Sequence, residues 1–518
     1  MRCYSESEEV DFAIVGTGAG GGVLAARLAE AGFSVIAFDA GPFWRPLEEF
    51  ASDEREQSKL YWLQNRISGG EHPIEFGENN SGRAVGGSTV HFQMVALRWR
   101  PEWFAARSKL GYGFDWPVSW EEMWRYYAEI EDAMKISGPV NYPWGPPRGR
   151  YPYRAHEVNA AGLVLAKGAE ALGVPWAPTP LATVSAPRGR SHPCVYRGFC
   201  KTGCSTNAKQ SMLITFVPRA IKAGCEIRDL AMVGRIETRN GRVTELVYHR
   251  AGEWRRQRAK NIVVAGYAIE TPRLLLSSAS AEFPDGLANG SGLVGKYFMA
   301  HSNDAAWAVM PEEIRWYKGP PSMAVCEHWN YEDKKDFHGG YAFMSQGPLP
   351  VDFATALVAN TGVFGAELRE WMALYNHMGG LKIVGETDPQ ENNRVELSDE
   401  KDEFGLPLPK ITFSYSENDK NLQQHSKKFM RSMLEAAGGS NFFDTTSTAH
   451  LMGGCRMGFS PKDSVVNALG RSWDISTLWV CDGSLFPTSG GVNPSITIAA
   501  NAARIADGIK ALGARGEL

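Results

Sequence analysis

The stretch DFAIVGTGAGGGVLAARL, residues 11–28, places five glycines within seven positions between two apolar segments. The apolar run 12–15 predicts a buried parallel strand. The residues after the glycines predict a helix over about 23–31. A second buried strand is expected over 33–38, and Asp39 ends it. Strand, tight turn, helix and strand within about 30 residues match the size of one βαβ unit.

The glycines have the spacing of a nucleotide-binding fingerprint. Gly16, Gly18 and Gly21 fit the pattern G-x-G-x-x-G. The first glycine permits the turn, the second lets a pyrophosphate approach, and the third lets the helix pack on the strand. Asp39 stands where a carboxylate would accept hydrogen bonds from an adenosine ribose, which disfavours NADP. The segment therefore predicts dinucleotide binding, and a glycine-rich packing turn is the alternative.

Composition excludes several classes of protein. The 518 residues are 43% hydrophobic and 22% charged, as in an ordinary globular chain of two to four domains. The net charge of −4 provides no broad surface for nucleic acid. No apolar run reaches the roughly 18 residues of a membrane span. The first eleven residues contain no signal-peptide core. We expect a cytoplasmic protein, with export alongside a signal-bearing partner as the alternative; an oligomer is possible.

Three further segments resemble parts of a ligand site. GRAVGGSTVHF, 82–92, has a second glycine pair followed by hydroxyls. NIVVAGYAIETPRLLLSS, 261–278, predicts a buried strand, a glycine turn and a helix with Pro272 in its first turn. The last comprises HLMGGCRMG, 450–458, and the segment 478–509, which contains CDGSLFP and NPSITIAANAARIAD.

Taken in order along the chain, these segments resemble the glucose–methanol–choline (GMC) oxidoreductases. VGTGAGGG, VGGST, LVGKYFMAH, HLMGGCRMG and NPSITIAANAARIAD match the family's motifs. The resemblance implies FAD as cofactor and a bacterial branch of sugar and glycoside dehydrogenases and oxidases. The cofactor-binding residues expected from the fingerprint and from the resemblance are Gly16, Gly18, Gly21, Asp39, Gly86, Gly87, Ser88, Thr89, His91, Ala265, Asp482, Pro494 and Ser495.

The resemblance also implies an α/β fold in two parts. A Rossmann-like FAD domain would be assembled from residues 1–105, 195–305 and 445–518. An α+β substrate domain with a mainly antiparallel sheet would comprise 106–194 and 306–444. Within the latter, apolar spacing predicts a surface helix over 124–137. The aromatic segment 307–343 is expected to pack in the core, with a sugar-stacking platform as the alternative.

His450 and Asn493 are the predicted catalytic pair. Removing a hydride from an alcohol requires a base for the hydroxyl proton, and histidine titrates near neutrality. By resemblance, Asn493 would orient the substrate oxygen on the same face of the flavin. Local sequence favours a different role, because asparagine is among the best helix N-caps and Pro494 fits the first helical position. The helix N-terminus would point toward the flavin's pyrimidine edge.

Two other histidines belong to these motifs. His91 follows the GGST loop, and a histidine near this loop contacts or is covalently bound to FAD in some relatives. Either arrangement is an expectation from the resemblance. His301, at the end of LVGKYFMAH, is predicted to be a buried, hydrogen-bonded structural residue.

Cysteines 194, 200 and 204 are clustered in a chain that otherwise uses the residue sparingly. Three thiolates are too few for a closed zinc site. Similar spacing holds an iron–sulfur cluster in some relatives, although those carry a doubled cysteine and a Cys-Pro that this chain lacks. The hypotheses are therefore an iron–sulfur cluster, a disulfide, or buried thiols that shape a turn near the FAD.

The sequence thus predicts an FAD enzyme that oxidises a secondary hydroxyl of a pyranose sugar or glycoside; C3 is the favoured position, with C1 or C2 as alternatives. Its partners would be the small-molecule sugar and either O2 or an external electron acceptor. Two other functions remain open: the flavoprotein subunit of an iron–sulfur and cytochrome-linked dehydrogenase, and a non-catalytic flavin-binding module.

Overall fold

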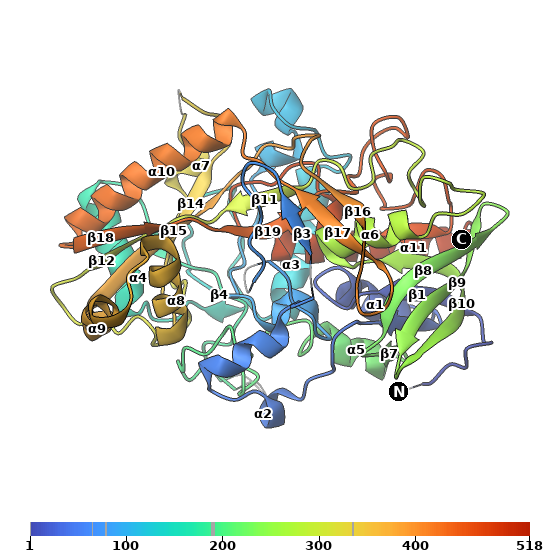
Figure 1. Cartoon of the computed structure of the whole chain (residues 1–518), viewed down its shortest axis with the longest axis horizontal. Coiled ribbons are helices and arrows are strands. Elements are labelled where there is room, and N and C mark those ends of the chain that lie inside the picture. The colour runs from blue at the N-terminus through green and yellow to red at the C-terminus, as the bar shows by residue number, and fades with distance from the viewer. Residues whose placement is uncertain (1, 65, 78–79, 188–191, 334–335) are drawn as a thin grey trace.

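The protein is described from a computed structural model that covers residues 2–64, 66–77, 80–187, 192–333 and 336–518. Two large sheets lie at opposite ends of an elongated molecule, and several of the loops and strands between them approach both (Figure 1). Within these described ranges, no helix combines the length and the apolar character that crossing a bilayer would require.

The first sheet contains the predicted βαβ unit. Its order is β7-β2-β1-β10-β9-β8, and β20 pairs with β10. The pairs around β1 and β20 are parallel, whereas β8, β9 and the first half of β10 are antiparallel. Its strands are β1 (Val10–Val15), β2 (Val35–Phe38), β7 (Glu226–Arg228), β8 (Met232–Arg239), β9 (Arg242–Arg250), β10 (Glu253–Val264) and β20 (Leu478–Val480).

The second sheet is antiparallel, as expected for the substrate domain. Its order is β18-β12-β15-β14-β13-β6, and β11 pairs with both β15 and β19. The strands are β6 (Ala177–Pro178), β11 (Met299–Ser302), β12 (Ala305–Val309), β13 (Ala324–Cys326), β14 (Tyr341–Ser345), β15 (Met378–Gly385), β18 (Ser440–Thr445) and β19 (Thr448–Met452). β11 and β19 extend this sheet toward the first, although the expected boundaries place both in the FAD domain. That division of the chain stays a prediction.

Smaller pairings and eleven α-helices complete the described chain. β3 (Ile67–Gly69), β16 (Arg394–Lys401) and β17 (Pro407–Thr412) form a three-stranded sheet, and β4 (Ser137–Gly138) pairs with β5 (Tyr153–Arg154). The helices are α1 (Gly21–Glu30), α2 (Pro46–Glu49), α3 (Trp120–Ala133), α4 (Ala160–Ala171), α5 (Phe216–Lys222), α6 (Tyr267–Ser277), α7 (His328–Tyr331), α8 (Pro350–Thr361), α9 (Gly365–Ala373), α10 (Glu417–Ala436) and α11 (Ser495–Ala514).

Helix packing follows the apolar faces. α1 packs against α5 and α11, and α3 packs on α11. At the other end, α4 and α10 pack on one another and against β15 (Figure 1). The buried alanines of α11 allow this close packing, because a short side chain lets neighbouring helices approach.

Two helix predictions were wrong in their placement. α3 begins four residues before the expected 124, because the Ser119 hydroxyl accepts the Glu122 N–H and caps the helix there. Pro272 does not lie in the first turn of α6. The helix already begins at Tyr267, so the proline lies inside it. Sequence spacing showed the helical period but not these starting points, and that of α3 depends on the Ser119 cap.

The aromatic segment packs in the core. Trp316, Tyr341 and Phe343 are completely buried, and Trp307 stacks parallel to Phe443 with ring centroids 5.7 Å apart. None of the eight aromatic residues between 307 and 343 lines the large cleft described below. The alternative of a sugar-stacking platform is therefore not supported by their positions.

Candidate active site

The glycine-rich turn connects β1 to α1 and is shaped by close backbone contacts. Gly16 has φ +95°, and a Cβ there would lie 2.3 Å from the Ala265 carbonyl oxygen. A Cβ on Gly21 would lie 2.0 Å from the Gly16 carbonyl oxygen. At Gly18 the nearest atom to such a Cβ is the Gly87 Cα, at 3.7 Å. Packing within the protein thus requires glycine at 16 and 21, whereas the bare backbone at 18 faces open space.

The Thr17 hydroxyl links three of the predicted segments. It donates to Asp39 Oδ2 (2.6 Å) and accepts the Gly86 N–H (2.9 Å). Asp39 also accepts the backbone N–H groups of Thr17 (3.1 Å) and Gly41 (3.0 Å). Burial raises the pKa of this carboxyl to about 6, against the effect of these hydrogen bonds. Asp39 therefore fixes the turn, in addition to lining the cleft where a ribose is expected.

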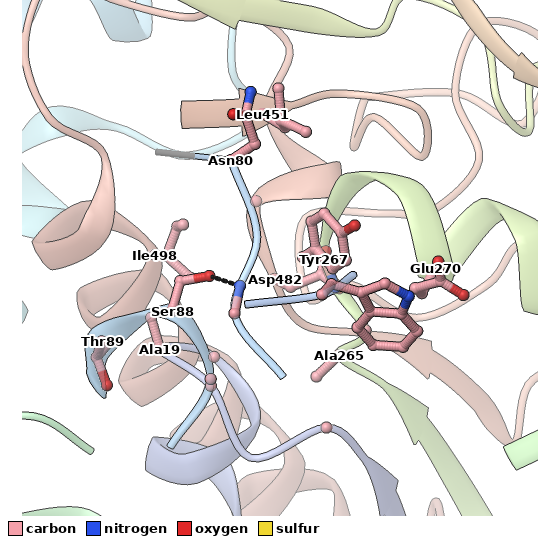
Figure 2. A pocket seen from close by; sticks show the side chains of 18 of the residues that line it. Ala19, Asn80, Ser88, Thr89, Ala265, Tyr267, Glu270, Leu451, Asp482 and Ile498 are labelled. Carbon is pink, nitrogen blue, oxygen red and sulfur yellow. Dashed lines mark hydrogen bonds between the residues drawn. The ribbon is translucent and has the colours of Figure 1, made fainter. Parts of the chain in front are cut away.

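The second glycine segment, Gly86 and Gly87, forms a tight loop that faces the glycine-rich turn at Gly18. Gly86 and Gly87 have φ values of +97° and +56°. The Ser88 Oγ accepts the Gly82 N–H at 2.9 Å, as Figure 2 shows on the side of the pocket opposite Tyr267. The Thr89 hydroxyl donates to the Gly86 carbonyl (2.6 Å) and accepts the Met212 N–H (2.9 Å). Both hydroxyls therefore hold the loop itself, and Ser88 retains a proton to donate.

Asp482 fixes the third wall. Its Oδ2 accepts the Tyr267 N–H (2.8 Å) and the Thr271 hydroxyl (2.6 Å), and its Oδ1 accepts the Ser484 N–H (2.8 Å). Burial raises the pKa of the carboxyl. This side chain thereby ties the end of β20 to the start of α6, which follows Ala265 (Figure 2).

His450 lies at a β-bulge between β11 and β19. The register pairs Ala300 with Leu451 and His301 with Ala449, so His450 is the extra residue. Its φ of +53° is left-handed, which non-glycine residues adopt rarely. A bulge redirects the side chain of the extra residue and often lies next to a functional site. Here it turns the imidazole into the cleft.

Three side chains are linked through this imidazole. Asn493 Nδ2 lies 3.0 Å from His450 Nε2, and His301 Nδ1 lies 3.0 Å from His450 Nδ1. Burial, followed by electrostatic interactions with His301 and Lys382, holds the pKa of His450 well below its usual range. His450 is therefore neutral near pH 7, and one of its two ring nitrogens carries a lone pair that can accept a proton. The structure brings together the two residues of the predicted pair.

Asn493 is not the helix cap. α11 begins at Ser495, Pro494 is its N-cap residue, and no side chain caps it. Pro494 was expected one position further along, inside the helix. Because its side chain reaches His450, Asn493 leaves the first N–H groups of α11 facing the cleft.

All these elements line one elongated cleft with about 1760 Å³ of empty space, including the part open to solvent. It contains most of the predicted site residues. Those at its walls are Gly16, Gly18, Asp39, Gly87, Ser88, Thr89, His91, Ala265, His450, Asp482, Asn493, Pro494 and Ser495. Gly21 and Gly86 lie behind the surface, where they permit the packing and the turn.

The cleft suits a dinucleotide with a polar ring system. Several buried polar atoms on its walls have no hydrogen-bond partner among the described residues: His91 Nε2, Asn493 Oδ1, Tyr267 Oη and Ser277 Oγ. Buried polar atoms are normally paired, so these mark positions for ligand atoms. The bare Gly18 and the N-terminus of α1 supply a phosphate position at one end.

His91 is part of the cleft wall. It is 5% exposed and meets the Tyr61 ring edge-on, with centroids 5.0 Å apart. Burial, followed by the nearby Lys209 and Lys201 charges, lowers its pKa to about 3. The imidazole is therefore neutral, and its contact with or bond to a flavin stays a prediction.

Other cleft residues were not anticipated from the sequence. Lys382 Nζ donates to Gln93 Oε1 at 2.6 Å, near His450. A lysine within the otherwise apolar run of β15 is the signal that was available for it. Asn303, Trp62 and Phe92 carry no comparable signal, because their positions depend on how distant segments meet.

The iron–sulfur and disulfide hypotheses find no support. Cys194, Cys200 and Cys204 are free thiols. Among the described residues, which include all three, no group of three or more His, Cys, Asp or Glu side chains is arranged to hold a metal ion. Instead, the buried Lys209 ammonium donates to the carbonyls of Cys200 (2.6 Å) and Val90. Lys209 therefore ties this loop to the segment that contains Val90.

Comparisons with known proteins agree with this geometry. Residues 75–303 and 389–502 match two models of the GMC oxidoreductase family. The chain is 32% identical to 2-methyl-1,2-propanediol dehydrogenase from Mycolicibacterium austroafricanum, over 97% of this chain and 95% of the relative. It is 29% identical to the fructose dehydrogenase large subunit from Gluconobacter japonicus (98% of each) and 29% identical to paromamine 6'-oxidase from Streptomyces fradiae (96% and 91%).

Among solved structures, pyridoxine 4-oxidase from Mesorbium loti superposes with a TM-score of 0.67 at 17% identity, covering 96% of this chain and 99% of that one. This likeness shows the fold. The family models and the full-length relative together show that this chain is a GMC oxidoreductase, an FAD-linked enzyme family that acts on CH–OH groups.

Proposed function

We propose that this enzyme oxidises a secondary hydroxyl of a pyranose sugar or glycoside, with C3 favoured over C1 or C2. The observation that carries the proposal is the 3.0 Å contact between Asn493 Nδ2 and His450 Nε2 at the wall of the cleft. The names of relatives support a sugar-like substrate, since fructose dehydrogenase and paromamine 6'-oxidase each match more than nine tenths of this chain. The position of oxidation rests on the sequence resemblance.

In this mechanism the chain provides proton transfer and orientation. FAD, held by the two glycine loops and by Asp482, supplies the hydride acceptor when it is bound. His450 Nε2 accepts the proton of the substrate hydroxyl, because its imidazole is neutral and buried. For this step the substrate hydroxyl replaces the Asn493 NH₂ group at His450 Nε2. The Asn493 amide then hydrogen-bonds the same substrate oxygen and orients it. Exclusion of water from this buried part of the cleft strengthens the hydrogen bonds of His450 and Asn493 to the substrate oxygen.

The N-terminus of α11 adds a fixed electrostatic contribution. Its free N–H groups carry partial positive charge and face the cleft beside Asn493. We propose that they would favour negative charge on a ring system bound beside them, by roughly 0.3–2 kcal/mol.

Anaerobic mixing tests the proposal. FAD-loaded protein is mixed with glucose, a glucoside, fructose, an aminoglycoside and a 1,2-diol, and the flavin absorbance is followed. We expect bleaching by a pyranose, and the product's regiochemistry identifies the carbon. His450→Ala is expected to slow reduction by roughly 10²–10⁴-fold, with FAD retained. His156→Ala is the matched control, because His156 is also buried and has both ring nitrogens bonded but lies outside the cleft.

Each outcome decides between functions. A normal rate in the His450 variant contradicts its assignment as base. No bleaching by any hydroxyl compound supports a non-catalytic flavin module. Parallel turnover with O2 and with an artificial acceptor separates an oxidase from a dehydrogenase. Because one relative is a large subunit, a transfer of electrons to a partner subunit is the second candidate, favoured if only the artificial acceptor works.

A further inference from the structure

Behind His450, away from the cleft, a chain of hydrogen bonds ends at a backbone carbonyl. His301 is completely buried; its Nε2 lies 3.0 Å from the Ser489 carbonyl oxygen and its Nδ1 lies 3.0 Å from His450 Nδ1. Ser489 is itself fixed, since its hydroxyl donates to the Thr387 carbonyl and accepts the Thr387 N–H, both at 2.9 Å.

The carbonyl determines where the proton of His301 lies. A carbonyl oxygen accepts hydrogen bonds and cannot donate them, so His301 Nε2 must carry a proton. Burial lowers the pKa of His301 to about 4, and the ring is therefore neutral near pH 7. A neutral imidazole with a proton on Nε2 has a lone pair on Nδ1.

That lone pair in turn determines the tautomer of His450. The two Nδ1 atoms are 3.0 Å apart and need one proton between them, which His301 cannot supply. His450 Nδ1 must therefore carry it, and His450 Nε2 has the lone pair. The Asn493 NH₂ group, 3.0 Å away, donates to that lone pair. In the other tautomer of His450, its Nδ1 lone pair would face the Nδ1 lone pair of His301. Its Nε2–H donor would then face the NH₂ donor of Asn493.

The strand pairing holds this arrangement in place. His301 lies on β11 and His450 lies at the bulge of β19 opposite it, so both rings are positioned by one ladder of backbone hydrogen bonds. The ring planes meet at 82° with centroids 5.2 Å apart, an orientation in which one ring edge points at the other. The left-handed φ of His450 shows that the backbone is held in a rare conformation to achieve this.

We propose that His301 is a positioning residue that, anchored on the Ser489 carbonyl, fixes His450 in the tautomer whose Nε2 faces the substrate as a proton acceptor. The inference rests on the proposed function and assigns to His301 a chemical role beyond filling space. Which nitrogen of a histidine is protonated is set by the hydrogen bond of the other nitrogen.

The first test reads the tautomer directly and needs no substrate. FAD-loaded protein labelled with ¹⁵N-histidine is compared with its His450→Asn variant to assign the His450 signals. We expect the shift of an N–H nitrogen at Nδ1 and that of a lone-pair nitrogen at Nε2, near pH 7. The opposite assignment overturns the proposal, whatever the enzyme's substrate.

The second test uses three variants. His301→Leu removes the acceptor and leaves the His450 Nδ1–H buried without a partner, so the desired tautomer is disfavoured. We expect flavin reduction to slow by roughly 10–100-fold, as for other residues that orient a functional imidazole. His301→Asn places an amide oxygen near the lost Nδ1 and is expected to recover most of the rate. His156→Leu, the matched control, makes the same change in a buried histidine outside the cleft and should leave the rate unchanged.

Outcomes for the two proposals are distinguishable. If wild-type flavin is not reduced by any alcohol, the proposed function fails, and the ¹⁵N shifts still decide the tautomer. If the wild type is active and His301→Leu folds, binds FAD and reduces it at the wild-type rate, the positioning role is wrong. If His301→Leu does not fold, the ¹⁵N shifts of the wild type and the rate of His301→Asn decide whether the positioning role holds.

Discussion

Glu386 provides a quantitative prediction about the segment that supports the candidate site. It follows β15 directly and precedes Thr387, whose backbone holds Ser489 and thereby the anchor of His301. The carboxyl is 4% exposed and accepts the Tyr112 hydroxyl at 2.9 Å. Its second oxygen, Oε2, is buried without a hydrogen-bond partner among the described residues. Burial raises the pKa of Glu386 from its ordinary value of 4.5 to about 7.

The sign of the effect follows from proton linkage. A carboxyl with a raised pKa binds its proton more tightly in the folded state, so the protein loses stability as pH rises through the folded pKa. The stabilisation that the protonated Glu386 carboxyl contributes is fully present below pH 4.5 and is lost by about pH 7. At about 1.4 kcal/mol per pH unit, this difference corresponds to roughly 3 kcal/mol of unfolding free energy.

Glu386→Gln removes the charge and keeps an oxygen for the Tyr112 hydroxyl. We expect variant and wild type to have nearly equal unfolding free energies near pH 4.5. As pH rises, the variant should become more stable than the wild type, by up to roughly 3 kcal/mol of unfolding free energy at pH 8. Urea unfolding of both proteins at saturating FAD, in steps from pH 4.5 to 8.5, measures the difference.

Glu391→Gln is the control of opposite sign. Glu391 is exposed, and its hydrogen bond with Lys296 lowers the pKa of the carboxyl. Its glutamine variant should lose stability at neutral pH. A Glu386→Gln difference that is constant between pH 4.5 and 8, or that favours the wild type at pH 8, would refute the argument that burial disfavours the charged carboxyl.

Two further predictions concern the cleft. Lys382→Met removes a cation whose charge lowers the pKa of His450, so the pKa of His450 should rise in the variant. When the rate of flavin reduction is measured against pH, the acid limb of the profile should move to higher pH. An unchanged profile would contradict this effect of the Lys382 charge. Gly18→Val inserts a side chain where the protein leaves open space and should weaken FAD binding by roughly 1–3 kcal/mol while the apoprotein keeps its melting temperature. A fluorescence titration of the apoprotein with FAD measures the affinity of each variant. Gly149→Val is the control, because a Cβ at that glycine would meet nothing within 4 Å, and this variant should bind FAD normally.

The sequence predicts the nucleotide-binding half well, because its determinants are local. The turn at Gly16, the helix behind it and Asp39 at the end of β2 occupy 24 consecutive positions, and each is set by backbone freedom or by hydrophobic period. We expected His450 and Asn493 to lie close together because the order of the motifs resembles that of the GMC family. This expectation rested on the resemblance and not on a physical rule that links the two residues.

What sequence reasoning missed depends on partners distant in the chain. Local rules assign Asn493 to the cap of α11, and the structure gives it to His450 instead, because an imidazole projects from the neighbouring strand. The sequence left three hypotheses open for the cysteines; in the structure they are free thiols, and the Lys209 ammonium donates to the Cys200 carbonyl in their loop.

The β-bulge shows why the site could not be derived from residue types. A histidine in a regular β19 strand would alternate with its neighbours and have a side chain perpendicular to the sheet. One extra residue breaks that alternation, and the register shift lies between the residues that face His450 from β11. The same shift puts His301 Nδ1 against His450 Nδ1. The pairing of these two short strands therefore positions the candidate base and, together with the Ser489 carbonyl, accounts for its proposed tautomer. A variant that restores regular pairing should change both together.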